Sequence, residues 1–321
     1  MPELVAMGET MVLFTPDERG PLRYARSFHM RIGGAESNVC IGLARLGRSA
    51  GWISRLGDDQ FGRFVLAQIR GEGVDTSGVR TDASAPTGIY FKETREVGGT
   101  EVVYYRRGSA ASKLERSDLD LDYLGAAKVF LVSGITAALS ANCRDALEWA
   151  IAQVRRRGVT VALDPNVRLK LWSAAEAREV LVRLCRSADW VLPGLDEAEL
   201  MTGCADPEDA ARRLLDLGVS QVYMKLGAEG SLVAHGGGVQ RVSGFAVPRV
   251  VDPIGAGDAY AAGVIAALLE GRSPAEAARF GNASGALAVT VAGDIEALPT
   301  RRELDAFMAA SAGGRRPDVV R

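Results

Sequence analysis

The chain has 321 residues, of which 47% are hydrophobic and 24% charged, and its formal net charge is −2. This composition is typical of an ordinary soluble protein with one large domain or two modest ones, and it favours neither a nucleic-acid nor a membrane partner. With two histidines the chain cannot form His-rich zinc sites, and it contains neither the P-loop motif GxxxxGK[ST] nor the dinucleotide fingerprint GxGxxG.

Short apolar runs alternate with helical patterns along most of the chain, which predicts an α/β fold with a mostly parallel sheet between two layers of helices. Such sheets bind ligands at the carboxyl ends of their strands. The expected strands are residues 4–7, 50–54, 128–132, 159–163, 190–192 and 221–225. The expected helices are residues 35–46, 60–72, 141–156, 174–186, 207–217, 257–270, 274–291 and 302–310.

Two regions, about 11–32 and 87–107, break this alternation with β-rich runs at 11–14, 27–31, 88–93 and 100–106. Val97-Gly98-Gly99-Thr100 is typical of a hairpin turn between the last two runs. We expect a small separate sheet that acts as a lid and excludes water, rather than an edge extension of the main sheet. Residues 1–310, with this lid included, are expected to form one domain, and residues 311–321 are expected to be a flexible tail.

The segment Asp252-Pro253-Ile254-Gly255-Ala256-Gly257-Asp258 precedes the apolar run 259–269. A helix start leaves backbone N–H groups without partners and carries a partial positive charge, and small residues let an anion approach it. Asp258 adds a carboxylate, which suits a site that moves phosphate onto a hydroxyl, because a base must take the hydroxyl proton. The alternative is a Gly turn followed by a helix cap, and the segment alone leaves both open.

Two further glycine segments precede predicted helices. In Gly33-Gly34-Ala35-Glu36-Ser37-Asn38 the glycines allow close backbone approach to a ligand, and Asn38 can bind substrate hydroxyls or a neighbouring loop. Gly57-Asp58-Asp59 closes a strand, and there a structural N-cap is the preferred interpretation.

Together with the loop Lys225-Leu226-Gly227-Ala228-Glu229-Gly230, these motifs resemble the ribokinase-like (PfkB) family of sugar kinases in order and spacing, from about residue 4 to 310. The resemblance implies a three-layer α/β/α domain with a β-sheet lid, and ATP and Mg²⁺ as cofactors. It implies Asp258 as catalytic base and the N–H groups of Gly255, Ala256 and Gly257 as the anion hole. The nucleotide contacts that it implies are Asn166, Lys225, Gly227, Gly230, Gly257 and Asn282.

Within that family, the segments 104–111 and 164–172 resemble the 2-keto-3-deoxygluconate kinases. A sugar acid carries a carboxylate, and arginine binds a carboxylate through two N–H groups. Arg106 and Arg168 are the candidates, against the alternatives of a solvated lid residue and a surface salt bridge. The resemblance places around the substrate Gly34, Asn38, Tyr90, Tyr104, Arg106, Arg168, Asp252 and Asp294.

The sequence departs from the family pattern at two positions. Gly194 stands where an Asn is usual, so Asn166 is expected to take part of that role while Glu197 acts on magnesium through water. Pro253 stands where Thr is common, which leaves open whether a monovalent cation such as K⁺ binds nearby.

The expected function is therefore ATP-dependent phosphorylation of the terminal hydroxyl of 2-keto-3-deoxygluconate. A kinase of a neutral sugar such as fructose or ribose, an inactive sugar-binding regulator and a nucleotide-dependent oxidoreductase are the alternatives. The resemblance also implies a homo-oligomer joined through the lid sheets. Four scattered cysteines and the lack of a signal-peptide pattern favour the cytoplasm.

Overall fold

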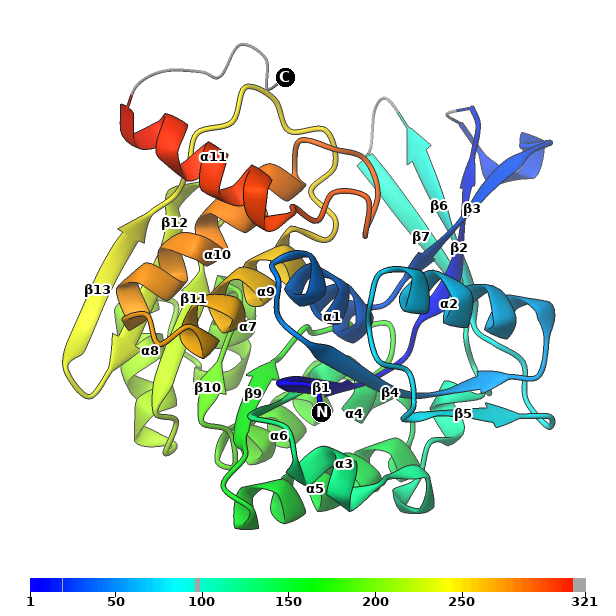
Figure 1. The fold of residues 1–321 in the computed structure, drawn as a ribbon, viewed down its shortest axis with the longest axis horizontal. Helices are drawn as coiled ribbons and strands as arrows, with labels where there is room; N and C mark the ends of the chain where they lie inside the picture. Colours follow the sequence, from blue (N-terminus) through cyan, green and yellow to red (C-terminus); the bar gives the residue numbers. More distant parts are fainter. Residues whose placement is uncertain (19, 96–98, 314–321) are drawn as a thin grey trace.

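The computed structural model describes residues 1–18, 20–95 and 99–313 (Figure 1). Its main sheet has nine strands in the order β13-β12-β11-β10-β9-β8-β1-β4-β5. The strands from β11 to β5 are parallel, and the edge hairpin β12–β13 is antiparallel. Their bounds are β1 Leu4–Met7, β4 Ala50–Gly57, β5 Val79–Asp82, β8 Val129–Ser133, β9 Thr160–Asp164, β10 Trp190–Val191, β11 Gln221–Lys225, β12 Gly230–His235 and β13 Gly238–Ser243. The predicted α/β class with a mostly parallel sheet is confirmed.

Helices cover both faces of this sheet (Figure 1). One face carries α1 Ala35–Arg45, α2 Gln60–Gly71, α9 Ala256–Leu269, α10 Pro274–Ala288 and α11 Arg301–Gly313. The other carries α3 Leu121–Gly125, α4 Gly134–Leu139, α5 Ala141–Arg156, α6 Ala174–Cys185, α7 Leu195–Thr202 and α8 Pro207–Asp216. No helix of the described residues is long and apolar enough to cross a membrane.

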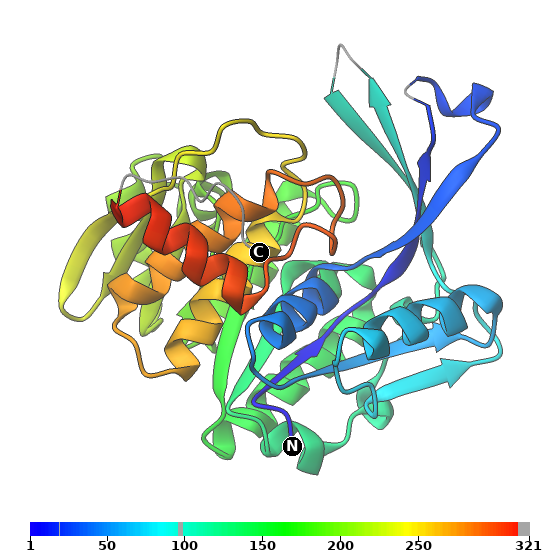
Figure 2. The ribbon, with the colours of Figure 1, turned by 45° about the horizontal axis from the view of Figure 1, so that its top comes forward.

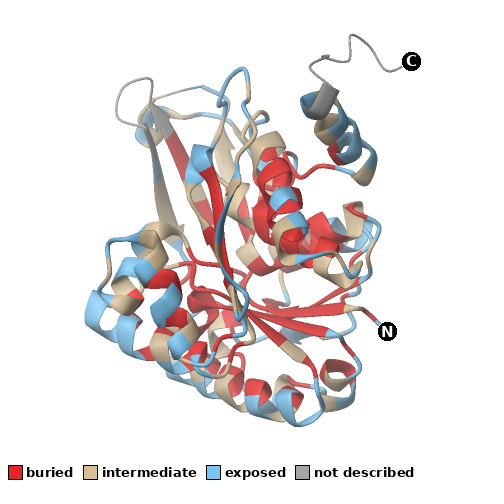
Figure 3. Ribbon diagram, turned by 90° about the vertical axis from the view of Figure 1, so that its left-hand side faces the viewer, coloured by how far each residue is buried: buried red, intermediate tan, exposed pale blue. Residues whose placement is uncertain are grey.

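Each face of the sheet has its own hydrophobic core, because successive side chains of a strand point to opposite faces. Trp52 and Ile53 are neighbours in β4, yet Trp52 belongs to the core under α1 and α9, and Ile53 to the core under α5 and α6. All four residues of β1 are buried, as expected for a central parallel strand covered on both sides. Figure 3 shows the buried sheet between helices whose outer surfaces are exposed.

The lid is a separate four-stranded sheet in the order β3-β2-β6-β7. Its strands are β2 Met11–Pro16, β3 Phe28–Gly33, β6 Ile89–Arg95 and β7 Gly99–Tyr105. Figure 2 shows it rising away from the main body, so the predicted lid, and not an edge extension, is present. Val97 and Gly98 of the predicted turn lie outside the described residues, and Gly99 and Thr100 begin β7. Residues 311–313 of the predicted tail instead extend α11 to Gly313, and the rest of that tail lies outside the described residues.

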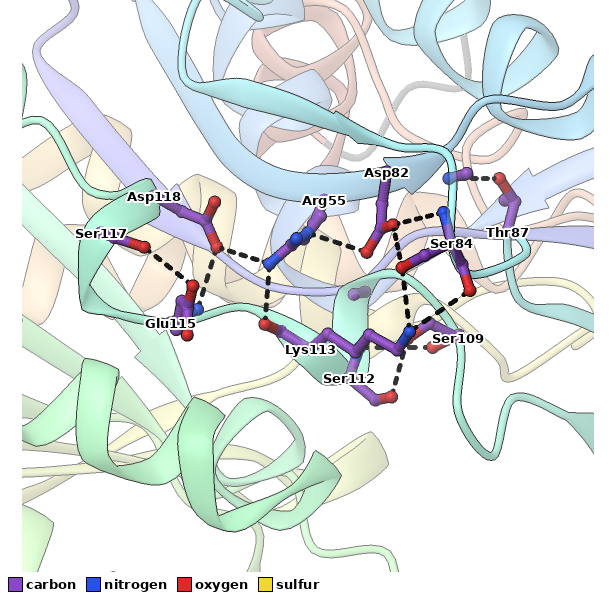
Figure 4. A network of polar contacts seen from close by, with 12 residues as sticks. Arg55, Asp82, Ser84, Thr87, Ser109, Ser112, Lys113, Glu115, Ser117 and Asp118 are labelled. Atoms are coloured by element: carbon purple, nitrogen blue, oxygen red, sulfur yellow. Dashed lines mark hydrogen bonds and ion pairs between the residues drawn. The ribbon is translucent and has the colours of Figure 1, made fainter.

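Polar contacts anchor both stems of the lid hairpin to the core (Figure 4). Arg55 of β4 pairs with Asp82, which precedes β6, at 3.1 Å. Arg55 also donates to the carbonyl of Lys113 at 3.0 Å and pairs with Asp118 at 3.3 Å, both after β7. Lys113 reaches across to the hydroxyl of Ser84 at 3.2 Å. The two stems therefore leave the core at a fixed spacing.

Candidate active site

A cavity of about 1140 Å³ lies between the lid and the carboxyl ends of the parallel strands. Lys170, in the loop after β9, donates to the carbonyl of Val102 in the lid at 3.0 Å, so core and lid meet across the cavity. The lid and its stem contribute Met11, Tyr90, Lys92, Val102, Tyr104 and Arg106 to its walls. Gly33, at the end of the lid strand β3, also lines the cavity. The polar and glycine residues from the core are Glu9, Gly34, Asn38, Asp164, Asn166, Arg168, Gly194, Asp196, Glu197, Lys225, Gly227, Glu229, Arg241, Gly255, Gly257, Asp258 and Asp294.

The N-terminus of α9 opens into this cavity. Gly255 is its N-cap, with a left-handed φ of 83°, a conformation that a residue with a side chain rarely adopts. Among the described residues, no acceptor takes a hydrogen bond from the backbone N–H groups of residues 255–258. Gly255 and Gly257 line the cavity, so this turn forms part of its wall, and its predicted role as an anion hole is chemically suited to these N–H groups.

Asp258 lies in the wall of the cavity beside this turn. Burial raises the pKa of Asp258 to about 7; the Asn38 hydrogen bond opposes the rise, while the nearby Asp164 and Asp294 carboxylates add to it. The carboxyl group accepts a hydrogen bond of 2.8 Å from Nδ2 of Asn38. The NH₂ group of Asn38 thus orients Asp258, and because Asn38 also lines the cavity, its expected contact with substrate hydroxyls stays a prediction.

Lys225 of β11 forms a buried ion pair with Asp164, which ends β9. Its Nζ lies 3.0 Å from each of the two Asp164 carboxylate oxygens. Burial by itself would lower the pKa of Lys225, but the Asp164 and Glu197 carboxylates outweigh it and raise that pKa. A Cβ placed on Gly257 would lie 3.8 Å from Nζ of Lys225, so this fixed positive charge adjoins the start of α9.

Glu197 and Asn166 line the part of the cavity next to Lys225. One Glu197 oxygen accepts the N–H of Gly194 at 2.7 Å and the other accepts that of Val167 at 2.8 Å. Asn166 has a φ of 36°, an uncommon conformation for a residue other than glycine. The described residues contain no group of three or more His, Cys, Asp or Glu side chains placed to hold a metal ion. These residues fit Mg²⁺, which is often held by one or two carboxylates, waters and nucleotide phosphates.

On the lid side of the cavity, two lid side chains converge on Asp294. The Tyr90 hydroxyl donates to Oδ2 of Asp294 at 2.9 Å, and Nζ of Lys92 binds Oδ1 at 2.5 Å. Nζ of Lys92 also lies 3.7 Å from Oδ2 of Asp252. Lys92 was not among the predicted site residues, although Tyr90 and Lys92 are two positions apart in a strand and must therefore share its face.

The two candidate arginines are in different states. Arg106 is buried and forms an ion pair with Glu9. Its Nε and Nη2 lie 2.7 and 2.5 Å from Oε2 of Glu9, so Arg106 is not a solvated lid residue. Ser109 also donates to Glu9, at 2.5 Å. Arg168 is exposed at the rim, donates to its neighbour Val167 and has no ion-pair partner among the residues that the structure describes. The surface salt bridge considered for Arg168 is therefore absent there.

Four predicted site residues lie outside the lining of the cavity: Asp252, Ala256, Gly230 and Asn282. Asp252 instead accepts the N–H of Ile254 at 3.0 Å. Gly230 occupies a left-handed turn at φ 104°, where a Cβ would clash with a β13 carbonyl. The amide of Asn282 is likewise used by two β13 carbonyls, at 3.0 and 3.2 Å, and not presented to the cavity. The side chains of Asp252 and Asn282 therefore hold neighbouring backbone in place.

Comparison with known proteins agrees with this geometry. Residues 1–301 match the pfkB family carbohydrate kinase model. A 2-dehydro-3-deoxygluconokinase of Bacillus subtilis is 42% identical over 310 residues, 96% of each chain. A 2-dehydro-3-deoxygluconokinase of Thermoproteus tenax is 38% identical over 314 residues, 97% of this chain and 95% of that protein.

Solved structures show the same likeness. The PfkB protein from Polaromonas sp. JS666 is 42% identical, with a TM-score of 0.88 over 95% of this chain and 99% of that one. A putative ribokinase II from E. coli, in complex with ATP and Mg²⁺, is 27% identical with a TM-score of 0.89 over 96% and 99%. A Vibrio cholerae fructokinase bound to fructose, ADP and potassium is 30% identical with a TM-score of 0.84 over 95% and 98%.

Proposed function

Because the chain belongs to the pfkB family of carbohydrate kinases, we propose that it transfers the γ-phosphate of ATP to the terminal hydroxyl of 2-keto-3-deoxygluconate. The observation that carries this proposal is the pairing of Asp258 with the unpartnered N–H groups at the start of α9 in one cavity. The membership also makes the oxidoreductase alternative wrong. We also propose that the reaction takes place in the cytoplasm, where its donor ATP is available.

In the proposed mechanism, Asp258 takes the proton of the attacking hydroxyl as the oxygen approaches phosphorus. The N–H groups of Gly255, Ala256 and Gly257 and the ammonium of Lys225 stabilise negative charge on the transferring phosphoryl group. When bound, Mg²⁺ would neutralise phosphate charge, and Glu197 and Asn166 are placed to hold it through water. The lid excludes water, which would otherwise consume the donor.

The choice of a sugar acid rests on Arg168. A guanidinium at the cavity rim without an acidic partner among the described residues can bind a carboxylate through two N–H groups. Glu9 already binds Nε and Nη2 of Arg106. Arg106 therefore has only its other N–H groups to offer to the carboxylate of the sugar acid. The names of the Bacillus and Thermoproteus relatives agree with this substrate class.

We expect Arg168→Ala to raise KM for the sugar acid by roughly 10- to 100-fold, the equivalent of about 1.5–3 kcal/mol for a charged hydrogen bond. Turnover of a neutral sugar should change little. Assays of ADP release with sugar acids and with neutral sugars measure both the KM for the acid and the turnover of the neutral sugar. Arg186→Ala, at an exposed position near the end of α6, serves as the matched control. An equal loss for fructose would contradict carboxylate recognition by Arg168, and turnover of fructose alone would favour a neutral-sugar kinase.

A monovalent cation is a further candidate cofactor, because the Vibrio fructokinase structure contains potassium. Pro253 has no side-chain oxygen to offer such an ion. Measuring ADP release in K⁺ and in tetramethylammonium salts decides whether this chain uses one.

We also propose that the lid mediates pairing of two copies of the chain. On the sheet face opposite the cavity, the ring of Phe14 stacks on the ring of Phe91, with 5.2 Å between their centroids. The edge-to-face contact of Phe14 with Phe28 has 6.3 Å between the ring centroids. On the same face Met30 is 43% exposed and Tyr105 is 63% exposed. Apolar side chains gathered on one exposed sheet face are typical of an interface.

We expect Tyr105→Glu to shift the protein toward monomer in analytical ultracentrifugation, because the added charge would be buried between the two copies. Arg186→Glu, remote from the lid, should leave the sedimentation unchanged. A wild-type monomer at all concentrations would contradict this arrangement.

A further inference from the structure

Lys92 is a buried cation in the cavity that neither the family motifs nor the proposed transfer step uses. Only 6% of its side chain is exposed, although lysine is rarely buried without a partner. Its partners are Asp294 at 2.5 Å and Asp252 at 3.7 Å. A buried lysine that meets two carboxylates offsets charge that would otherwise be uncompensated there.

The contact joins the lid to the turn that begins α9. Tyr90 and Lys92 lie on one face of β6 and occupy both carboxylate oxygens of Asp294. The backbone of Asp294 in turn packs against the N-cap, because a Cβ on Gly255 would lie 3.1 Å from the Asp294 carbonyl oxygen. The residue whose carboxylate the lid holds therefore also supports the anion hole through its backbone.

We propose that Lys92 is a positioning residue for the kinase reaction. By pairing with Asp294 it keeps that carboxylate aimed at the distal hydroxyls of the sugar, and its positive charge offsets the Asp294 charge near Asp258. The inference rests on the proposed function in that Asp258 is taken as the base. Through Lys92 the lid therefore also sets the charge of the site, in addition to excluding water.

The surroundings of both carboxylates make this effect specific. The groups facing Asp258 are Asn38 of α1, Tyr90 of β6, Asp164 of β9, Lys225 of β11 and Asp294 after α10. Lys225 is already paired with Asp164, so it does not offset Asp294. On the other side of the Asp294 loop, Arg31 pairs with Glu296 at 3.5 Å. Lys92 is thus the cation, among the described residues, that contacts Asp294 directly.

The test is the pH dependence of kcat/KM in Lys92→Met. We expect the acidic limb of the Lys92→Met profile to move to higher pH by about half a unit or more. Without Lys92, the Asp294 carboxylate near Asp258 is uncompensated and disfavours ionisation of that base. KM for the sugar should rise roughly 10-fold as Asp294 loses its orientation. Tyr90→Phe, which removes a neutral hydrogen bond from Asp294, should raise KM without moving the limb.

The double variant Lys92→Met/Asp294→Asn removes the excess charge, so its limb should return to the wild-type position while KM stays high. Lys92→Arg keeps the charge and should keep the limb, which covers the case in which Lys92→Met does not fold. A folded Lys92→Met with an unmoved limb would overturn the proposal, and so would a shift that persists in the double variant. Because the limb can be measured with any accepted sugar, failure of the substrate assignment is a separate result.

Discussion

We expect Asp258→Asn to lower kcat by roughly 10²- to 10⁴-fold, the range typical of removing a general base. Asparagine keeps an oxygen that can accept the Asn38 hydrogen bond of 2.8 Å, but it cannot take the hydroxyl proton. KM for the sugar should stay within about threefold, because the change acts in the transition state and not on ground-state binding. Steady-state ADP release measures both constants.

The same variant should be more stable than the wild type at high pH. The pKa of Asp258 in the folded protein, about 7, lies above its ordinary value of 3.8. Its contribution to the free energy of unfolding is therefore fully present below about pH 4 and is lost as the pH rises through about 7. Thermal unfolding at about pH 8 and pH 4 should show the Asn variant gaining stability only at the higher pH.

Normal turnover in a folded Asp258→Asn would show that another group is the base.

The second large effect is expected for Lys225→Met. This change removes the positive charge beside the start of α9 and leaves the buried Asp164 carboxylate without its partner. We expect kcat to fall by at least about 10²-fold, the loss typical of one electrostatic contact to the reacting group. Stability should fall by roughly 3–5 kcal/mol, the cost of breaking a buried ion pair on one side.

A matched double variant separates the two effects. Lys225→Met/Asp164→Asn removes the stranded charge, so its thermal stability should recover while its kcat stays low. Recovery of the rate along with stability would mean that Lys225 serves the fold alone. A single variant with a nearly normal rate would contradict a role for Lys225 beside the phosphates.

Much of the fold could be predicted because its signals are local. Residues 4–7 and 221–225 are short apolar runs between polar segments, and the structure gives strands with these bounds. Strands β5, β12 and β13 were not among the predicted strands. Two of them, β5 and β13, are partly exposed edge strands that are not apolar throughout, and no helix separates β12 from β13. Such strands form because a neighbouring edge is available, which a window of sequence does not contain.

The site divides in the same way. The turn before α9 could be predicted because its glycines and Asp258 are contiguous. The pairing of Arg106 with Glu9 joins residues 97 positions apart, and that of Lys92 with Asp294 joins residues 202 apart. Which charges meet there depends on how the lid is set on the core, so sequence reasoning named Arg106 and Asp294 without finding their partners.

The most direct test of the account is the pH profile of kcat/KM for ADP release with 2-keto-3-deoxygluconate, compared between wild type and Asp258→Asn. Because Asp258 must be ionised to act as the base and its pKa is about 7, the wild-type rate should fall tenfold per pH unit below that value. The residual activity of Asp258→Asn should lack this limb. A wild-type profile that stays flat down to about pH 5, or the same limb in both proteins, would contradict the assignment of Asp258 as the base.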